Sequence, residues 1–135
     1  MSTTANFVAT IRTPVASIAN ADGTSFKTVM AAGSGGSRLD LLSIVNSDAA
    51  NAYVVQFAIQ VSGVDYEIGE VTVPIGAGTN GSAKAVNAMN ATDLPQLSNT
   101  LNVLFLASGA TLRARTKTAV SGVNTVRIVG CGGDY

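Results

Sequence analysis

The segment AYVVQFAIQVSGVDYEIGEVTVPI, residues 52–75, decides the fold class. Apolar residues recur at every second position from Tyr53 to Val61, as on one face of a β-strand. Ser62-Gly63 is a two-residue turn signal, and apolar residues alternate again after it. Beyond Gly69 the alternation is shifted by one residue, which indicates a β-bulge. The segment therefore predicts an antiparallel hairpin with a bulge in its second strand.

Further strand patterns precede and follow this hairpin. Turn residues rich in Gly, Ser, Asn and Asp separate five other strand-like runs, at 26–30, 38–46, 100–108, 110–120 and 124–130. Residues 82–97, SAKAVNAMNATDLPQL, predict one short helix that ends near Pro95. Eight or so short strands with one small helix favour an all-β fold, an antiparallel β-sandwich of jelly-roll type.

The length of 135 residues fits one domain of ordinary size. Residues 1–22 alternate weakly and predict an N-terminal arm or an edge strand, which leaves residues 23–135 as the single sandwich domain. No run reaches the roughly 18 to 20 apolar residues that cross a bilayer, and the first residues lack a signal-peptide pattern. The single cysteine, Cys131, suits synthesis in a reducing cytoplasm. We therefore expect no membrane partner.

The composition favours self-association. Apolar residues make up 47% of the chain and charged residues 12%, about half the usual charged share. In a single domain, such an excess of apolar residues predicts that part of the surface is buried against other subunits. The net charge is zero, which gives the chain no general attraction to nucleic acid. We therefore expect a homo-oligomer and no nucleic-acid partner.

A glycine motif at Gly76-Ala-Gly78-Thr-Asn-Gly81 matches the G-x-G-x-x-G turn that holds the pyrophosphate of a dinucleotide. Its surroundings do not fit that function. The preceding strand alternates and contains Pro74, and the next acid, Asp93, does not end a second parallel strand. The segment GSGGSR, residues 33–38, also lacks the lysine of a P-loop. Both segments predict loops in which glycine supplies positive φ, and no cofactor is expected.

The residues for catalysis are scarce. The chain has no histidine, which removes the usual general base and the commonest metal ligand. Asp65, Glu67 and Glu70 could form a carboxylate pair for glycoside hydrolysis or a Ca²⁺ site, but the solvated outer face of a hairpin is the simpler interpretation. We expect no enzymatic activity, no catalytic residue and no bound metal.

Two features are candidate partner contacts. Arg113, Arg115 and Lys117 alternate with Leu112 and Ala114, so the three cations share one face of a strand and form what we call the basic stripe. These cations would repel one another unless an acidic surface faces them, either on a partner or on the acidic hairpin of a neighbouring copy. The N-terminal region offers apolar contacts at Phe7, Ile11, Val15 and Ile18.

Three segments, residues 63–90, residues 106–122 and the terminal GGDY, resemble head cement (decoration) proteins of tailed bacteriophages, in particular those of jelly-roll type. The resemblance covers about residues 20–135. It implies a structural virion protein, made in the host cytoplasm, that coats the outer capsid surface as a homodimer or homotrimer and bridges neighbouring major capsid proteins. A phage tail or fibre component, or a receptor-binding β-sandwich module, is the alternative.

Overall fold

The computed structural model describes residues 8–95, 97 and 102–135. These residues form ten strands and one 3-10 turn, η1 (Asn20–Asp22). The strands are β1 (Thr10–Arg12), β2 (Val15–Ala19), β3 (Lys27–Ala31), β4 (Ser37–Asn46), β5 (Tyr53–Val61), β6 (Val64–Val73), β7 (Val86–Asn87), β8 (Leu104–Leu106), β9 (Thr111–Thr116) and β10 (Thr125–Asp134).

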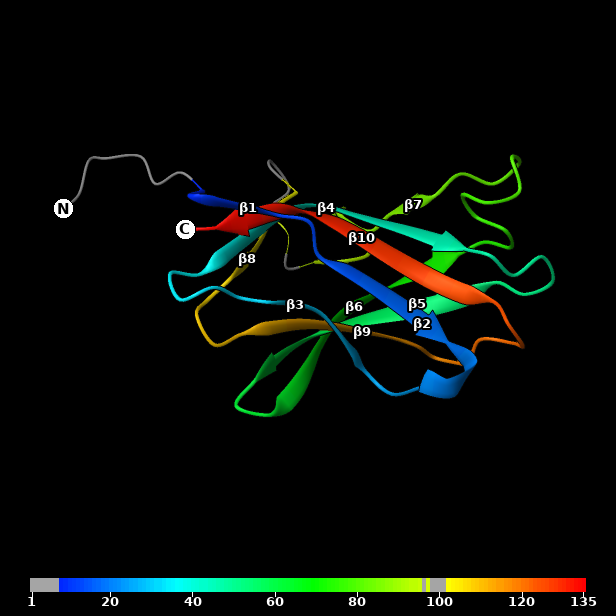
Figure 1. Cartoon of the computed structure of the whole chain (residues 1–135), viewed down its shortest axis with the longest axis horizontal. Coiled ribbons are helices and arrows are strands. Elements are labelled where there is room, and N and C mark those ends of the chain that lie inside the picture. Colours follow the sequence, from blue (N-terminus) through cyan, green and yellow to red (C-terminus); the bar gives the residue numbers. More distant parts are fainter. Residues whose placement is uncertain (1–7, 96, 98–101) are drawn as a thin grey trace.

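The strands form two antiparallel sheets that pack as a sandwich (Figure 1). In sheet A, β10 and β4 lie side by side at the centre; β1 and β2 pair with β10, and β7 and β8 pair with β4. Sheet B has the order β3-β9-β5-β6. Apart from the β5–β6 hairpin, the chain changes sheet between successive strands from β2 to β7 and from β8 to β10. This alternation is the jelly-roll topology, which confirms the predicted fold class.

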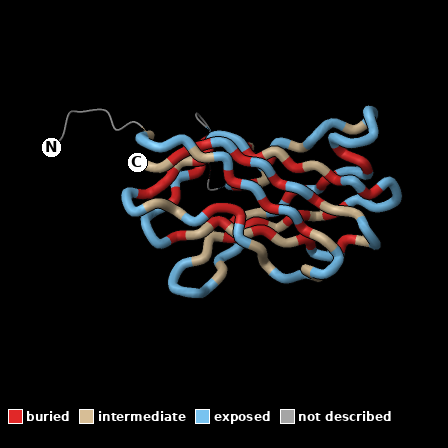
Figure 2. Tube along the Cα trace, in the orientation of Figure 1, coloured by how far each residue is buried: buried red, intermediate tan, exposed pale blue. Residues whose placement is uncertain are grey.

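The core lies between the two sheets, and buried positions alternate with exposed ones along the strands (Figure 2). This alternation follows from the opposite directions of successive side chains in a strand. Sheet A contributes the fully buried Ile18, Leu42, Ile44, Val126 and Ile128, and sheet B contributes Val55, Phe57, Val73, Leu112 and Ala114.

The β5–β6 hairpin has the predicted turn and the predicted bulge. Ser62 and Gly63 have φ values of 51° and 78°, and two positive φ values are what a tight hairpin turn requires. The register shifts opposite Phe57 and Ala58, where Gly69 pairs with Phe57 and Glu67 pairs with Ala58. Ile68 is therefore the extra residue of a bulge, and its side chain is buried.

The helix predicted over 82–97 is wrong. The described residues of this segment form turns and the short strand β7, which pairs with β4 at Ser43 and Ile44. The side-chain oxygen of Asn87 accepts a hydrogen bond from the N–H of Met89, and that of Asn90 accepts one from Asp93. Asparagine side chains compete with helical hydrogen bonds in this way, so local asparagine turns replace the helix.

The N-terminal segment is part of sheet A. β1 and β2 pair with opposite ends of β10, from Thr10 opposite Asp134 to Ala19 opposite Thr125. The described part of residues 1–22 thus lies beside β10 in sheet A. It is attached to the sandwich by a ladder of backbone hydrogen bonds.

Candidate functional site

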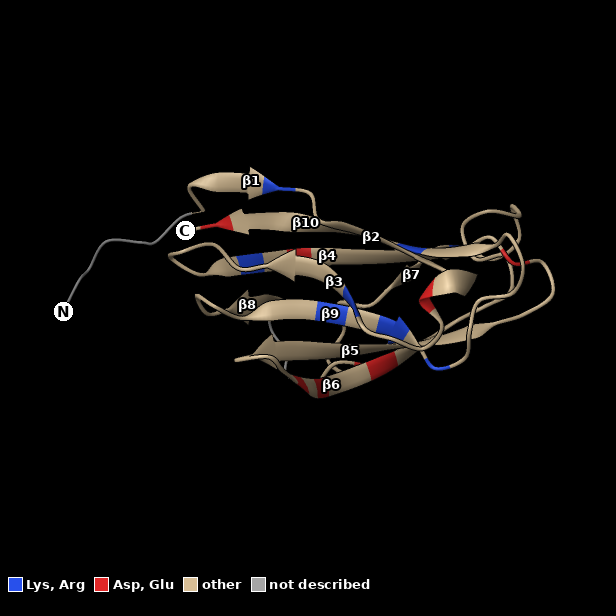
Figure 3. Ribbon diagram, turned by 60° about the horizontal axis from the view of Figure 1, so that its bottom comes forward, with Lys and Arg blue, Asp and Glu red and all other residues tan. Residues whose placement is uncertain are grey.

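The basic stripe lies on the outer face of sheet B, on β9 and just after it. Arg113 and Arg115 face outward because Leu112, Ala114 and Thr116 point into the core. Blue segments on β9 lie near red segments on β6 in Figure 3, and β5 separates the two strands.

Acids of the same chain neutralise two of the three cations of the stripe. Arg113 forms an ion pair with Asp65 at 3.2 Å, and Lys117 forms one with Glu70 at 3.0 Å. Long side chains span β5 to make these pairs. This arrangement corrects the expectation that a partner or a neighbouring copy must supply the acidic surface.

Arg115 forms no ion pair with a carboxylate of the described residues. Its Nε donates a hydrogen bond of 2.9 Å to Oε1 of Gln56 on β5, and its guanidinium lies 4.5 Å from the ring centroid of Phe26. The same segment binds Arg113, which donates a hydrogen bond of 2.6 Å to the carbonyl oxygen of Phe26. Hydrogen bonds and a cation–π contact thus fix the middle of the stripe in place.

The outer face of sheet A is apolar by contrast. One row across it consists of Val15, Val129, Ser43 and Asn87, which are paired strand by strand. Val15 is 63% exposed and Val129 is 43% exposed. Strand alternation places these valines on the outer face. A patch of exposed apolar side chains is typical of a contact surface.

A second row, in which two apolar side chains flank an arginine and a glycine, crosses the other end of sheet A. Ile11 pairs with Gly133, Gly133 with Arg38, and Arg38 with Phe105, so these residues cross the sheet together. Ile11 and Phe105 are both exposed. Between the rows lie Leu41 and Cys131, which are also exposed and paired with each other.

The predicted N-terminal contacts divide into three groups. Phe7 lies outside the described residues. Ile11 and Val15 are exposed on the outer face of sheet A. Ile18 is fully buried in the core of its own chain, which corrects the prediction that it contacts a partner. Its inward direction follows from strand alternation in β2, in which Ala16 and Ile18 face the core.

The glycine motif forms a loop, as the sequence predicts. Gly76, Gly78 and Gly81 have φ values of 62°, 75° and 76°. The strand before the motif, β6, is antiparallel to β5, and the described residues after the motif form turns instead of a helix. The loop packs on the outer face of sheet A, where a Cβ on Gly78 would meet Cγ1 of Val45 at 2.6 Å.

A buried carboxylate joins two turns at one end of the sandwich, and the sequence did not single it out. Asp48 accepts hydrogen bonds from the hydroxyls of Ser121 at 2.5 Å and Tyr53 at 2.6 Å. The backbone N–H groups of Ala50 and Asn51 also bind it. The Ser121 hydroxyl first, then those other donors, hold the pKa of Asp48 well below its usual range. The only local signal is the turn SDAAN; Ser121 is remote in sequence.

A second polar cluster fixes the C-terminal end of β10. Asp134 accepts a hydrogen bond of 2.5 Å from Ser37 and pairs with Arg12 at 3.2 Å. These contacts, Ser37 first, lower the pKa of Asp134. Gly132 lies against the carbonyl oxygen of Arg38, where a Cβ has no space. These contacts therefore fix the terminal GGDY at the end of sheet A.

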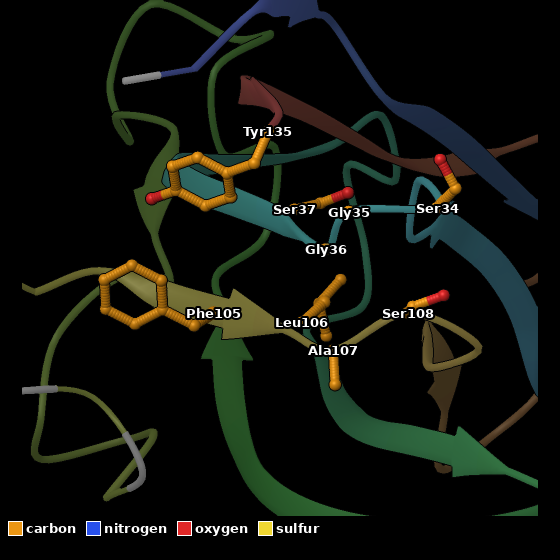
Figure 4. A pocket seen from close by; sticks show the side chains of 9 residues that line it. All are labelled: Ser34, Gly35, Gly36, Ser37, Phe105, Leu106, Ala107, Ser108 and Tyr135. Carbon is orange, nitrogen blue, oxygen red and sulfur yellow. The ribbon is translucent and has the colours of Figure 1, made fainter. Parts of the chain in front are cut away.

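An open hollow of about 580 Å³ lies beside this end of sheet A (Figure 4). The rings of Phe105 and Tyr135 stand at one side of it, and the hydroxyls of Ser34 and Ser108 lie at the other side. The remaining lining residues are Gly35, Gly36, Ser37, Leu106 and Ala107. The predicted loop GSGGSR thus forms part of its wall.

The residues that the structure describes bear on two further features, metal ions and membrane helices. No three His, Cys, Asp or Glu side chains among them are grouped closely enough to hold a metal ion. In the same part of the chain, no helix is long and apolar enough to cross a membrane.

The chain matches no protein-family model, and no curated protein matches it. Among solved structures, the Drosophila NLP core, described for pentamer formation and histone binding, has 13% identity and a TM-score of 0.46. That match covers 93% of this chain and 99% of the other.

Two structures of a pentameric capsid protein isolated from metagenomic phage sequences match with 17% identity and a TM-score of 0.42. These matches cover 96% of this chain but 63% and 65% of the capsid protein chains. The chain therefore spans slightly less than two thirds of their length. These matches are similarities of backbone arrangement. The description of the two outer faces rests on the residues of this chain and not on these matches.

Proposed function

We propose that this chain is a structural virion protein of a tailed bacteriophage, which binds the outer surface of the capsid lattice and reinforces it by bridging major capsid proteins. One observation carries the proposal: sheet A presents an apolar outer face, with Val15, Val129, Leu41 and Ile11 exposed. An exposed apolar surface of this kind is typical of a protein that acts by binding other proteins. The resemblance of residues 63–90 and 106–122 to cement proteins supports the same function.

Bridging acts through apolar burial and multivalency. Apolar contact contributes about 25 cal/mol per Å², so modest areas at several junctions add to a useful affinity. Linking several weak contacts within one assembly raises the overall affinity further. Because Arg113 and Lys117 are already paired within the chain, sheet B would contribute orientation and solubility more than affinity. The proposed activity is binding, without catalysis.

The proposal is tested by locating the protein in the virion. Purified virions of the phage that encodes the chain are analysed by mass spectrometry and by cryo-electron microscopy. We expect many copies per particle, with density for the sandwich on the outer capsid surface at repeated lattice positions. Absence of the protein from purified virions would exclude the proposal.

A tail or fibre location is the second candidate, and the hollow between Phe105 and Tyr135 favours it. Aromatic rings beside serine hydroxyls are a chemistry that suits a sugar or another receptor group. Binding on a glycan array that is lost in Tyr135→Ala, together with density at the tail, would support this candidate over capsid reinforcement.

A further inference from the structure

The outer face of sheet A carries an inference about self-association. We propose that two copies of this chain associate face to face through it, by a two-fold axis that crosses the strands near Val129. The proposal rests on the proposed function in one respect: it assigns the apolar face of that structural protein to a contact between two copies, so that contacts with the capsid would use other surfaces of the dimer. Its evidence is the shape, composition and charge of the face itself.

The face approaches the size of a specific interface. β4 and β10 have ten residues each, and sheet A is four strands wide at five of the ten levels of β10. With about 3.3 Å per residue and about 4.8 Å between strands, the plane measures roughly 500 Å² before the relief of the side chains is added. A stable protein–protein interface buries about 800 Å² per partner, so a dimer would use all of the face that the glycine loop at Gly78 leaves open.

The apolar side chains of the face are of moderate size, as face-to-face packing of two sheets requires. Val15 and Val129 are direct neighbours across β2 and β10, and Leu41 neighbours Cys131 across β4 and β10. Packed sheets lie about 10 Å apart with their side chains interdigitated. Valine and leucine on a pleated surface provide this depth.

Two charges lie on either side of Val129. Arg127 lies two residues before it on β10, faces outward, and forms no ion pair with any other described residue. Asp40 lies on the other side, on β4, as the extra residue where the register shifts between Cys131 and Gly132. Its carboxylate is exposed and pairs with Arg38 at 2.7 Å.

A two-fold axis at Val129 makes these charges complementary. The rotation reverses the strand direction of the facing copy, which places Asp40 of the second copy opposite Arg127 of the first. The symmetry repeats the contact, so each dimer contains it twice. The lateral offset is one strand spacing, about 4.8 Å, which an arginine side chain can span. A second copy thus supplies the carboxylate that Arg127 lacks in the described part of its own chain.

The experiment exchanges the two charges and requires no capsid. Arg127→Glu and Asp40→Arg are prepared separately, and association is measured by sedimentation velocity and native mass spectrometry. Each variant alone opposes like charges across the axis, and we expect its dissociation constant to rise at least about tenfold. In an equimolar mixture, the two introduced side chains face each other at one contact, and the native Asp40 faces the native Arg127 at the other. We therefore expect heterodimers with an affinity close to that of the wild type.

A second pair of variants tests the apolar part. Val129→Asp on the outer face of sheet A should give a monomer, whereas Thr72→Asp, exposed on the outer face of sheet B, should associate like the wild type. Far-ultraviolet circular dichroism establishes that both variants fold. The single thiol, Cys131, reports the covered face: it should react with a maleimide more slowly in the wild type than in Val129→Asp.

The two proposals fail separately. A wild-type monomer at micromolar concentration, or a mixture of charge variants that does not recover association, would overturn the face-to-face dimer. Capsid decoration by such a monomer would leave the proposed function intact. If the protein forms the dimer and the charge variants behave as expected, but the protein is absent from virions, the dimer would stand and the proposed function would be excluded.

Discussion

On the outer face of sheet B, Arg113 and Lys117 find carboxylates on β6, two strands away in the same sheet. On the outer face of sheet A, Arg127 lies among Val15, Val129 and Ser17 and has no carboxylate partner among the described residues. The first face thus pairs two of its three stripe cations within the chain, and Gln56 and Phe26 hold the third, Arg115. The second exposes apolar groups together with Arg127 and the Arg38–Asp40 ion pair, and apolar groups with an arginine are typical of a surface that another protein covers.

The difference arises from strand order. β6 carries Asp65, Glu67 and Glu70 because the hairpin turn brings it beside β5, and β9 occupies the opposite side of β5. Acids and bases therefore share one face of sheet B. In sheet A, β2 has no charged residue, and β10 has only Arg127 and Asp134. The same fold thus gives one self-sufficient face and one face suited to contact.

If the two sheets differ only in the side chains on their outer faces, then truncating a core side chain should destabilise the protein equally in either sheet. We expect Ile128→Ala beneath sheet A and Leu112→Ala beneath sheet B each to lower the free energy of unfolding by about 2–5 kcal/mol, because both side chains are fully buried. Urea denaturation measures this. A large loss for one variant and almost none for the other would show that the sheets are not equally packed.

The next effect concerns the turn at Asp48, which follows β4 of sheet A and precedes β5 of sheet B. Its pKa is lowered in the folded state, so its stabilising contribution is complete above the unfolded pKa of about 3.9 and is lost as the pH falls below that value. We expect Asp48→Asn to lower Tm by several degrees at pH 7 and to reduce the difference from the wild type in acid.

The matched control is Ser121→Ala, which removes one donor and keeps the carboxylate. It should lower Tm less than Asp48→Asn and retain the acid sensitivity. Parallel curves of Tm against pH for the wild type and Asp48→Asn would contradict the assignment of this carboxylate.

Two glycines of the loop beside the apolar face, Gly78 and Gly81, both have positive φ but differ in what surrounds them. Gly81→Ala should cost roughly 1 kcal/mol, because alanine resists its positive φ while nothing lies within 4 Å of the added methyl. Gly78→Ala should cost more, because its methyl also meets Val45 at 2.6 Å. Thermal unfolding measures both variants. An equal loss for the two would mean that the loop does not pack on sheet A as described.

The smallest effect is expected on the charged face. A double-mutant cycle of Lys117→Ala and Glu70→Ala should give a coupling energy of at most about 1 kcal/mol, because both side chains are about half exposed, at 48% and 50%. The coupling should fall as salt is added. A larger, salt-independent value would show that sheet B is also covered by another protein.

Much of the fold could be predicted because strand signals are local. The period of two from Tyr53 to Val61, the Ser62-Gly63 turn and the shifted phase after Gly69 all lie within one hairpin. The helix over 82–97 was predicted wrongly for an equally local reason: Asn87 and Asn90 bind the backbone two and three residues further on. Pairing of Val86 with Ile44 then holds the segment as a short strand.

The candidate surfaces were only partly accessible to sequence reasoning. Alternation predicted that the basic stripe faces outward, as it does on β9. The weak pattern of residues 1–22 did not separate Ile18, which faces the core, from Ile11 and Val15, which are exposed. That distinction needs the position of sheet B beneath β2. Neither row across sheet A can be derived from alternation alone, because Val15, Val129 and Ser43 come from three distant strands.

By itself, the sequence determined that this protein is an all-β sandwich with glycine loops, because alternation and turn chemistry act between residues a few positions apart. Only the tertiary structure decided which charges are neutralised and which face remains apolar. Arg113 meets Asp65 across 48 residues, and Asp48 meets Ser121 across 73. Such pairs depend on the order of strands in each sheet, which nothing local in the chain specifies.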